Sequence, residues 1–510
     1  MQPANTNRAP RKFGLAFWME RVLEECDRAS VNFAADPVHD LRVGLRRCRS
    51  MADGLRAVDP DPAWKQMKKA GKALFSRLGE LRDVQVMEEW VRKFDSPGDP
   101  VAARLLEFLS ARETHCKEEA AFALQEFDRK QWRRWSKTLP RRTARVRLGS
   151  LIFKHLALER LQEAHELHRI AMRNRSQVAF HQLRIGIKRF RYIVENFLPA
   201  QHEAWGDDLK KLQDLLGEVH DLDVLWTMAQ QASAFPTAED RSRWHGRIIE
   251  ARAERVTNYR LMMQGPGALW KPWQAHLPQG DQIQSAAILR LKAWAGFLDP
   301  DMRHANHVAR LALQLHDGLA PRNGHDPAQR AHDREILRLA ALLHDVGRCK
   351  GEKNHHKQTF RMLRKLQPPL GVSAQTLHMA GVVARYHRGA LPRSAHAALR
   401  ELPAAEKRDA LRLAGVLRLA NALDAQRDSS IRRLRVEDPS RTNGTRAIPR
   451  SDIALVIRAE GYKSNSAIAG SAAAERHLLE VVNRRPILLR PLQVARRARP
   501  PTARTKAVLV

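Results

Sequence analysis

Cysteine and aromatic residues are scarce in this chain of 510 residues. The four cysteines, Cys26, Cys48, Cys116 and Cys349, lie far apart and form no C-x-x-C pair. This spacing argues against a zinc ribbon, an iron-sulfur site and a disulfide scaffold, and it favours a reducing compartment, so we expect a cytoplasmic protein. Aromatic residues make up 6% of the chain, which gives little support for a surface that stacks nucleic-acid bases.

Long hydrophobic runs are also absent. No uninterrupted apolar run reaches the ~18 residues needed to span a bilayer, and the polar leader MQPANTNRAPRK runs into an amphipathic helix. The sequence therefore predicts no secretory or membrane-spanning segment. At roughly 150 residues per domain, the length predicts two to four domains.

Positive charge is what the chain has in excess. Lysine and arginine number 89 against 56 aspartates and glutamates, a net charge of +33, while the apolar content of 43% is that of a globular protein. Such an excess attracts polyanions. We therefore expect a nucleic acid, a phosphate polymer or an anionic membrane surface as the partner.

Two segments of the first half recur. VHDLRVGLRRCR, from Val38, returns as FHQLRIGIKRFR from Phe180, and LGELRDVQV, from Leu78, returns as LGEVHDLDV from Leu216. Both pairs recur at nearly the same separation, which predicts a duplicated helical unit with repeats over about residues 10–140 and 150–265.

One face of each recurring helix carries basic side chains at helical spacing. The residues are His39, Arg42, Arg46 and Arg49 in the first copy and His181, Arg184, Lys188 and Arg191 in the second. Arginine offers a planar fork of donors and lysine a compact charge, and both suit phosphate oxygens. A single stripe of this kind is more often a solvated face, but its repetition favours phosphate binding.

These duplicated segments resemble the CHAD family, the conserved-histidine α-helical domain, over about residues 10–265. The resemblance implies two pseudo-symmetric four-helix bundles around a basic channel that binds inorganic polyphosphate through the eight stripe residues. Five further lysines are additional candidates: Lys68, Lys69, Lys72, Lys210 and Lys211. The copies differ where Gln182 stands for Asp40 and His220 for Arg82, and neither change removes a cation from the stripe.

The rest of the chain divides by composition. Residues 266–283 concentrate Gly, Pro and Trp and are predicted to be a linker. Residues 284–430 are predicted to be helical, 431–492 to form a small α+β appendage, and 493–510 to be a basic tail. The expected fold class is therefore mainly all-α.

Histidines and aspartates gather in the second half. His304 shares a helix face with apolar residues, and His344 does the same with Asp345 beside it. Consecutive helix positions diverge by about 100°, so His344 and Asp345 can flank one ion while a histidine from another helix completes the site. A lone histidine on such a face is more often a core residue, but this set continues through His355, His356 and His387.

The segments LLHDVGR, NHHKQT, ARYHRGALP and LRLANALDAQR resemble the HD superfamily of metal-dependent phosphohydrolases. More narrowly, they resemble the HD-type C-terminal domain of the exopolyphosphatase and guanosine-pentaphosphatase family, over about residues 284–492. This implies a site for Mn²⁺, Fe²⁺, Mg²⁺ or Zn²⁺, whose bound water attacks phosphorus. The metal positions map to His304, His344, Asp345 and a distal aspartate, and the catalytic or substrate positions to His355, His356, His387 and Arg388.

The distal motif departs from the family pattern. Asn421 stands at the usual aspartate position, and Asp424 follows three residues later. Either Asp424 completes the metal site, or the site has lost its ion and the domain serves as a scaffold. In addition, exopolyphosphatases hydrolyse polyphosphate in an actin-like ATPase-type domain, for which this chain shows no sequence.

Together these patterns predict a cytoplasmic polyphosphate-binding protein with a metal-dependent phosphohydrolase domain that acts on polyphosphate or a related phosphorylated substrate. Polyphosphate granules or the nucleoid are the expected locations, and a scaffold form allows a homodimer. The alternatives are a non-catalytic polyphosphate-binding scaffold, an alarmone nucleotide hydrolase and a nucleic-acid-binding protein. No helix-turn-helix, RNP or zinc-finger signature supports the last.

Overall fold

The computed structural model describes residues 14–33, 35–319, 326–439 and 453–492, which form two compact units, Met1–Trp294 and Ala295–Val510. Within these ranges the chain is mainly helical, with twenty α-helices and one three-stranded sheet. This confirms the fold class expected from the sequence. The predicted basic tail, 493–510, lies outside the described residues.

Six helices build the first repeat. They are α1 (Leu15–Asn32), α2 (Ala35–Leu55), α3 (Pro62–Ala70), α4 (Lys72–Phe94), α5 (Pro100–Gln125) and α6 (Arg129–Thr143). Two of them begin at an Asp-Pro pair, because the Asp61 and Asp99 carboxylates accept backbone N–H groups of the first turn and proline needs no partner there. The predicted apolar face of α2 is fully buried.

Four long helices build the second repeat. They are α7 (Leu151–Asn174), α8 (Gln177–Phe197), α9 (Pro199–Gln231) and α10 (Ala238–Met263). Ser176 and Thr237 cap α8 and α10 with side-chain oxygens. The first repeat breaks at Gly71 into helices of 9 and 23 residues, whereas the second runs the equivalent stretch as the 33-residue helix α9.

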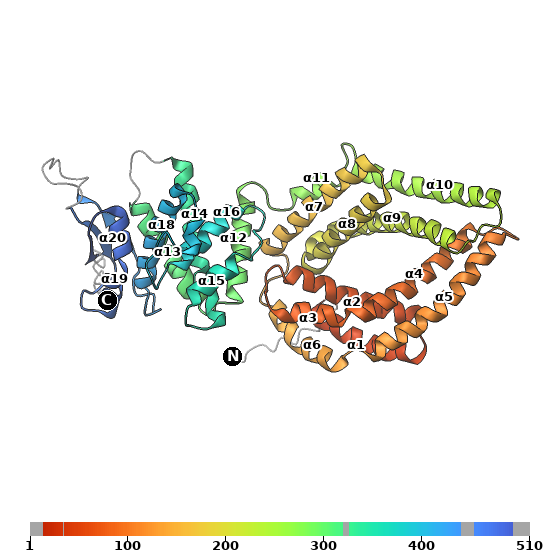
Figure 1. Ribbon diagram of the computed structural model, residues 1–510, viewed down its shortest axis with the longest axis horizontal. Coiled ribbons are helices and arrows are strands. Elements are labelled where there is room, and N and C mark those ends of the chain that lie inside the picture. The colour runs from red at the N-terminus through yellow and green to blue at the C-terminus, as the bar shows by residue number, and fades with distance from the viewer. Residues whose placement is uncertain (1–13, 34, 320–325, 440–452, 493–510) are drawn as a thin grey trace, which may run out of the picture. The chain divides into compact units, whose positions relative to one another are not determined.

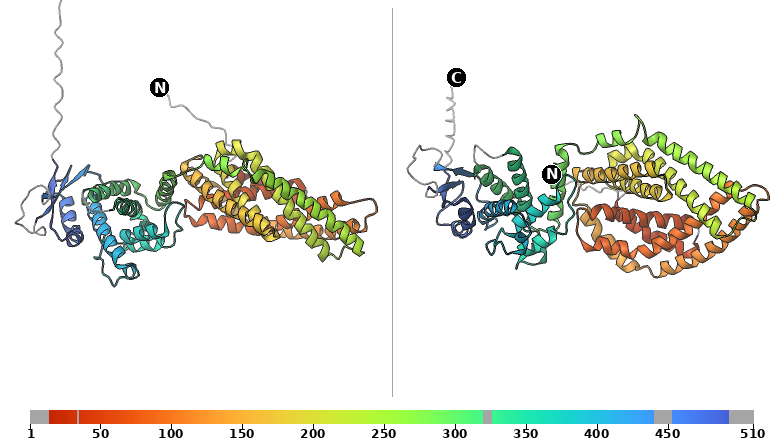
Figure 2. Two further views of the ribbon diagram at one scale, coloured as in Figure 1. Left: turned by 90° about the horizontal axis from the view of Figure 1, so that it is seen from above. Right: turned by 45° about the horizontal axis from the view of Figure 1, so that its top comes forward.

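The two repeats lie side by side, with α2 against α8, as Figures 1 and 2 show. At this contact the Asn196 amide donates to Ser50 Oγ at 2.9 Å, and Gly54 leaves room for the Phe197 ring, with which a Cβ would collide. A second contact lies elsewhere along the helices, where Trp244 Nε1 donates to Asp99 Oδ2 at 3.0 Å. The basic helices are thus brought together by contacts between the repeats.

The predicted linker, residues 266–283, contains the short helix α11 (Trp270–Ala275) and the start of α12 (Asp281–Gly296). Trp273 is buried with its ring centroid 5.5 Å from that of Phe190. This segment is therefore packed onto the second repeat.

Helices also dominate the second unit. They are α13 (Met302–Leu319), α14 (Pro327–Leu343), the 3-10 helix η1 (Val346–Lys350), α15 (His355–Leu363), α16 (Ala374–Arg385), α17 (Ala397–Arg400) and α18 (Ala404–Ala422). The helices α13, α14, α16 and α18 pack against one another around a core of leucine, valine and alanine. The helix ends around this core position the candidate metal centre.

The α+β appendage has the expected composition. Its strands are β1 (Leu434–Glu437), β2 (Leu455–Ala459) and β3 (Ile487–Pro491), and its helices are α19 (Ala467–Glu475) and α20 (His477–Asn483). The strand order is β1-β2-β3, with β2 antiparallel to β1 and parallel to β3. The appendage packs on the helical part, because β1 contacts α13 and α20 contacts α18.

Among the described residues, no helix combines the length and the apolar character that crossing a membrane requires.

Candidate metal centre and basic cluster

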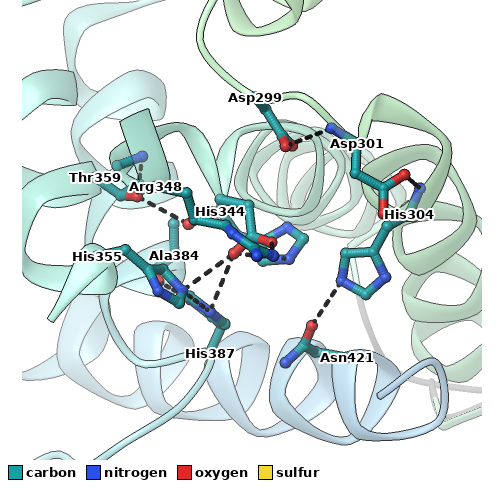
Figure 3. A network of polar contacts seen from close by, with 12 residues as sticks. Asp299, Asp301, His304, His344, Arg348, His355, Thr359, Ala384, His387 and Asn421 are labelled. Carbon is teal, nitrogen blue, oxygen red and sulfur yellow. Dashed lines mark hydrogen bonds and ion pairs between the residues drawn. The ribbon is translucent and has the colours of Figure 1, made fainter. Parts of the chain in front are cut away.

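Five buried residues at helix ends form the candidate metal centre (Figure 3). His304 lies in the first turn of α13, His344 and Asp345 lie between α14 and η1, His355 begins α15, and His387 follows α16. Each is no more than 2% exposed. The structure therefore brings together residues that the sequence places on separate helices.

The turn that carries His344 and Asp345 is fixed against α15. Thr359 Oγ1 donates to the His344 carbonyl at 2.8 Å and accepts the Gly347 N–H at 3.0 Å. Glycine is required here because a Cβ at Gly347 would collide with the His355 carbonyl oxygen. This close approach holds the first histidine of α15 beside Asp345.

Backbone carbonyls determine which nitrogen of three rings carries the hydrogen. The Nδ1 atoms of His344, His355 and His387 each lie 2.7 to 2.9 Å from the carbonyl oxygen of the residue three positions earlier. A carbonyl oxygen only accepts, so each Nδ1 is the donor. In a neutral ring the Nε2 atom then keeps its lone pair.

These three Nε2 atoms converge on one carboxylate oxygen. They lie 3.6, 3.1 and 3.7 Å from Asp345 Oδ1 for His344, His355 and His387, respectively, and the Nε2 atoms of His355 and His387 are 3.2 Å apart. Burial lowers the pKa of His344, and the pKa of His387 falls well below its ordinary value for the same reason. At these distances three ring nitrogens surround one carboxylate oxygen, an arrangement that a cation between them would stabilise.

Two groups of atoms in the described residues could hold a metal ion. His304, His344 and Asp345 form one group, and Asp345, His355 and His387 form the other, with the ligand atoms of each group within 4.8 Å of one another. His344 Nε2 is buried and has no hydrogen-bond partner within the part of the chain that the structure describes. This orphaned lone pair fits a metal ligand, and Asp345 is shared by the two groups.

Arginine occupies the other oxygen of Asp345. Arg427 Nη2 donates to Asp345 Oδ2 at 2.5 Å, and its Nη1 donates to Asp301 Oδ2 at 3.1 Å. Burial would raise the pKa of Asp345, but its contacts with the histidines and Arg427 hold the pKa far below the ordinary value. Sequence analysis missed Arg427, although it closes the LRLANALDAQR segment three residues after Asp424.

Asp424 and Asn421 contact opposite nitrogens of His304. Asp424 Oδ2 lies 2.7 Å from His304 Nδ1, and Asn421 Oδ1 lies 3.1 Å from His304 Nε2. Asp424 is fully buried, and its other oxygen accepts the Ser429 N–H at 2.9 Å. The structure thus places Asp424 behind His304 and outside both ligand groups, whereas Asn421 faces the other ring nitrogen, Nε2.

A second set of predicted residues lies beside this centre. His356 is buried but belongs to neither ligand group, and burial together with Arg385 and other nearby cations lowers its pKa to about 4. His356 Nδ1 and Arg385 Nη1 are buried without a hydrogen-bond partner among the described residues. Arg388 is exposed, and its charge also lowers the pKa of His356. These three residues are called here the Arg385 group: His356, Arg385 and Arg388.

The basic faces of α2 and α8 meet in the first unit. Burial, together with Arg184, Arg46 and Arg42, lowers the pKa of Lys188 to about 8. Burial also lowers the pKa of Arg42. The nearby Arg46 lowers this pKa further, whereas Asp83 raises it. Cations from both repeats therefore share one partly buried cluster, called here the basic cluster: Arg42, Arg46, Arg184 and Lys188.

Two aspartates that sequence analysis did not select lie in the basic cluster. Burial raises the pKa of Asp83 against the effect of Arg42, Arg184 and Lys188. Burial raises the pKa of Asp221 to about 6, against the effect of Arg184. Both occupy the same position of the recurring LGE segments, which was the signal that could have identified them.

A cavity of about 460 Å³ lies between the repeats beside these aspartates. It is lined by residues of α4, α5, α8 and α9, among them Glu80, Asp83, Arg112, His181 and His220. The rings of His181 and His220 lie 4.8 Å apart, and burial with Arg184 lowers the pKa of His220 to about 4. The predicted His181 thus faces the cavity from the head of the α8 stripe.

The remaining predicted polyphosphate-binding residues are more dispersed than the four of the basic cluster. Arg49 Nη1 donates to the Lys68 carbonyl at 2.8 Å, and Lys68 forms an ion pair with Asp53. Arg191 lies 3.9 Å from Glu195. Lys210 and Lys211 line a separate hollow of about 430 Å³, and three more predicted residues are exposed: His39, Lys69 and Lys72.

Two family models match separate parts of the chain. The family model described as "CHAD domain" matches residues 20–230, and the one described as "Ppx/GppA phosphatase, domain III" matches residues 283–455. No curated protein matches the chain. A solved structure, described as the CHAD domain from the plant Ricinus communis, is 24% identical, covers 51% of this chain and 88% of its own, and has a TM-score of 0.34.

Proposed function

Because this chain contains a CHAD domain followed by a Ppx/GppA phosphatase domain III, we propose that it binds inorganic polyphosphate and hydrolyses a phosphate bond. The basic cluster would bind the polymer, and the metal centre would carry the hydrolysis. The substrate would be polyphosphate or a related phosphorylated compound.

The concentration of like charges in the basic cluster supports polyphosphate binding. Bringing cations of two repeats together and partly burying them is unfavourable without a counter-charge, as the lowered pKa of Lys188 reflects. A polyanion would supply that charge, and arginine forks bind phosphate oxygens in pairs. Asp83 and Asp221 supply part of this counter-charge.

One observation carries the proposed hydrolysis: the Nε2 atoms of three buried imidazoles converge on Asp345 Oδ1. His344 would bind an ion with His304, and His355 with His387, while Asp345 would contribute to both groups. When bound, a divalent ion lowers the pKa of coordinated water and offsets charge on a phosphoryl group. Arg427 would orient Asp345 by holding Oδ2, which leaves Oδ1 directed at the histidines.

The Arg385 group, His356, Arg385 and Arg388, would orient the substrate. His356 Nδ1 and Arg385 Nη1 are buried polar atoms whose hydrogen-bonding capacity is unused within the described residues. Such groups are costly to bury unless a ligand pairs with them. Phosphate oxygens would accept from Arg385, with Arg388 at the exposed edge, so the phosphoryl group would lie beside His387.

Elemental analysis of protein purified without chelator tests the metal centre, together with phosphate release from long-chain polyphosphate before and after EDTA. We expect a bound divalent metal and release that EDTA abolishes. His344→Ala should lose both, whereas His332→Ala, a change elsewhere in α14, should lose neither. Metal-replete protein that releases no phosphate from polyphosphate or nucleotides would contradict the hydrolase.

A second candidate, a non-catalytic polyphosphate-binding scaffold, is favoured by the neutral Asn421 at His304 and by the arginine on Asp345. Both reduce the negative charge available to an ion. This candidate predicts polyphosphate binding that is indifferent to EDTA and to His344→Ala.

A further inference from the structure

The second repeat contains a groove of about 590 Å³ that the proposed function does not use. It runs along one face of α10 and is closed by α9, the start of α8 and the end of α7. Its volume is within the range of sites for small organic ligands. It shares two lining residues, Gln177 and Asp223, with the cavity between the repeats, and the Gln177 amide donates to Asp223 Oδ1 at 3.3 Å.

Aromatic rings line one end of this groove. The ring centroids of Trp226 and His245 lie 4.5 Å apart, and both rings line the groove. Ile249, one turn further along α10, is 50% exposed beside them. A flat apolar group could cover this surface and gain the free energy of burying it.

Arginines also line the groove, and Arg260, near the end of α10, is the lining residue of that helix farthest from His245. Arg252 is neutralised by Asp223, which accepts from Arg252 Nε at 2.8 Å. Arg260 and Arg175 have no ion pair with a carboxylate among the described residues, and Arg260 Nε is buried without a hydrogen-bond partner. The groove therefore carries an uncompensated positive charge that an anionic ligand would balance.

The spacing of the two ends selects an elongated ligand. His245 and Arg260 are separated by about four turns of α10, or about 22 Å at 1.5 Å per residue, and long arginine side chains shorten the span that a ligand must bridge. A nucleoside triphosphate has an aromatic base at one end and a chain of phosphates at the other. We propose that this groove binds a nucleoside triphosphate, with its base on Trp226 and His245 and its phosphates toward Arg175 and Arg260.

This assignment separates the groove from the basic cluster chemically. Inorganic polyphosphate has no ring to cover Trp226, which lines the groove. Base stacking on an aromatic side chain contributes on the order of 1–3 kcal/mol. A nucleotide should therefore prefer the groove, and polyphosphate the basic cluster.

Isothermal titration of the full chain with ATP and with GTP, in saturating long-chain polyphosphate, tests the groove. We expect one nucleotide site per chain that polyphosphate does not abolish. Trp226→Ala and Arg260→Gln should each weaken nucleotide binding about tenfold or more, because each removes one end of the site. The matched control Arg173→Gln, an exposed arginine of α7 outside the groove, should leave it unchanged.

Three results would overturn the nucleotide site. One is nucleotide binding that polyphosphate displaces completely, which would place the nucleotide on the basic cluster. Another is unchanged nucleotide binding in Arg260→Gln, which is the variant least disturbing to the fold. The third is equal binding of inorganic triphosphate and ATP to the groove, since the base would then contribute nothing. Because polyphosphate binding is measured separately, failure of the basic cluster would be distinguishable from failure of the groove.

Discussion

The basic cluster and the metal centre gather ionisable side chains in opposite ways. The basic cluster takes long, partly exposed cations from the middle of α2 and α8, whereas the metal centre takes short, fully buried rings from the ends of four helices. Cations in the cluster repel one another, while in the centre the Nδ1 atoms of His344, His355 and His387 are each held by a backbone carbonyl. Binding by the cluster should therefore be shared among many residues, and the centre should depend on each of its own.

The sharpest test of this comparison is removal of the shared carboxylate. Asp345→Asn takes the negative charge from both ligand groups and leaves Arg427 without its strong partner. We expect loss of bound metal and a fall of more than ~100-fold in phosphate release, because ligand loss exceeds the 10–100-fold effect of outer contacts. Elemental analysis and phosphate assays measure this.

The exposed ion-pair residue Asp317 offers a control on the neighbouring helix α13. Asp317→Asn should alter neither metal content nor phosphate release, since surface ion pairs contribute about 0–1 kcal/mol. Polyphosphate affinity should be unchanged in both variants. An Asp345→Asn protein that keeps its metal would refute the shared-ligand arrangement.

Asn421 offers a gain of function in the same centre. Asn421→Asp places a carboxylate 3.1 Å from His304 Nε2, so it should raise metal affinity, and Asp424→Asn should lower it about 10–100-fold by releasing His304 Nδ1. Competition with a metal-sensitive dye measures both. If Asn421→Asp left affinity unchanged and Asp424→Asn abolished it, Asp424 would be a ligand and not a positioning residue.

The helices and the duplicated stripe could be predicted because both depend on local periodicity. Val38, Leu41 and Leu45 repeat at helical spacing and are fully buried in α2, and the stripe of α8 follows the same offsets. The residues of the metal centre could be selected because the segments that carry them resemble those of the HD superfamily in order along the chain.

Their arrangement could not be predicted, because it depends on how separate helix ends pack. The direction of each Nε2 is set by a carbonyl three residues earlier and by the approach of Gly347 to α15. Arg427 lies outside a helix and reaches Asp345 across the fold. Asp83 and Asp221 were missed because a carboxylate on a charged helix normally indicates a solvated face.

Single substitutions in the basic cluster should have smaller effects than those in the metal centre. Arg42→Ala, Arg184→Ala and Lys188→Ala each remove one of several cations, so each should weaken polyphosphate binding several-fold. Each should also reduce the slope of log affinity against log salt concentration by about one, the value of one phosphate contact. Titration at several salt concentrations measures this. Lys69→Ala, an exposed lysine outside the cluster, should change binding less. Equal effects at Lys69 and Lys188 would mean that net charge alone binds the polymer.

The smallest effect expected is the pH dependence of the basic cluster. Asp221 has a pKa raised to about 6 by burial, so it becomes neutral as the pH falls through 6 and stops repelling phosphate. Lys188 has a pKa lowered to about 8, so it loses its attraction as the pH rises through 8. Both changes act in one direction, and affinity should fall a few-fold across pH 5 to 9 at constant salt.

Asp221→Asn separates these two groups. An amide cannot ionise, so the decrease in affinity near pH 6 should disappear while the decrease near pH 8 remains. Fluorescence anisotropy of labelled polyphosphate, recorded across this pH range, measures both decreases in affinity. Asp214→Asn is the matched control, because Asp214 lies on the same helix and also has a raised pKa, but it faces Arg191 and Lys210 outside the cluster. If Asp214→Asn removed the decrease in affinity near pH 6 and Asp221→Asn did not, polyphosphate would contact the Lys210 side of α9 and not the basic cluster.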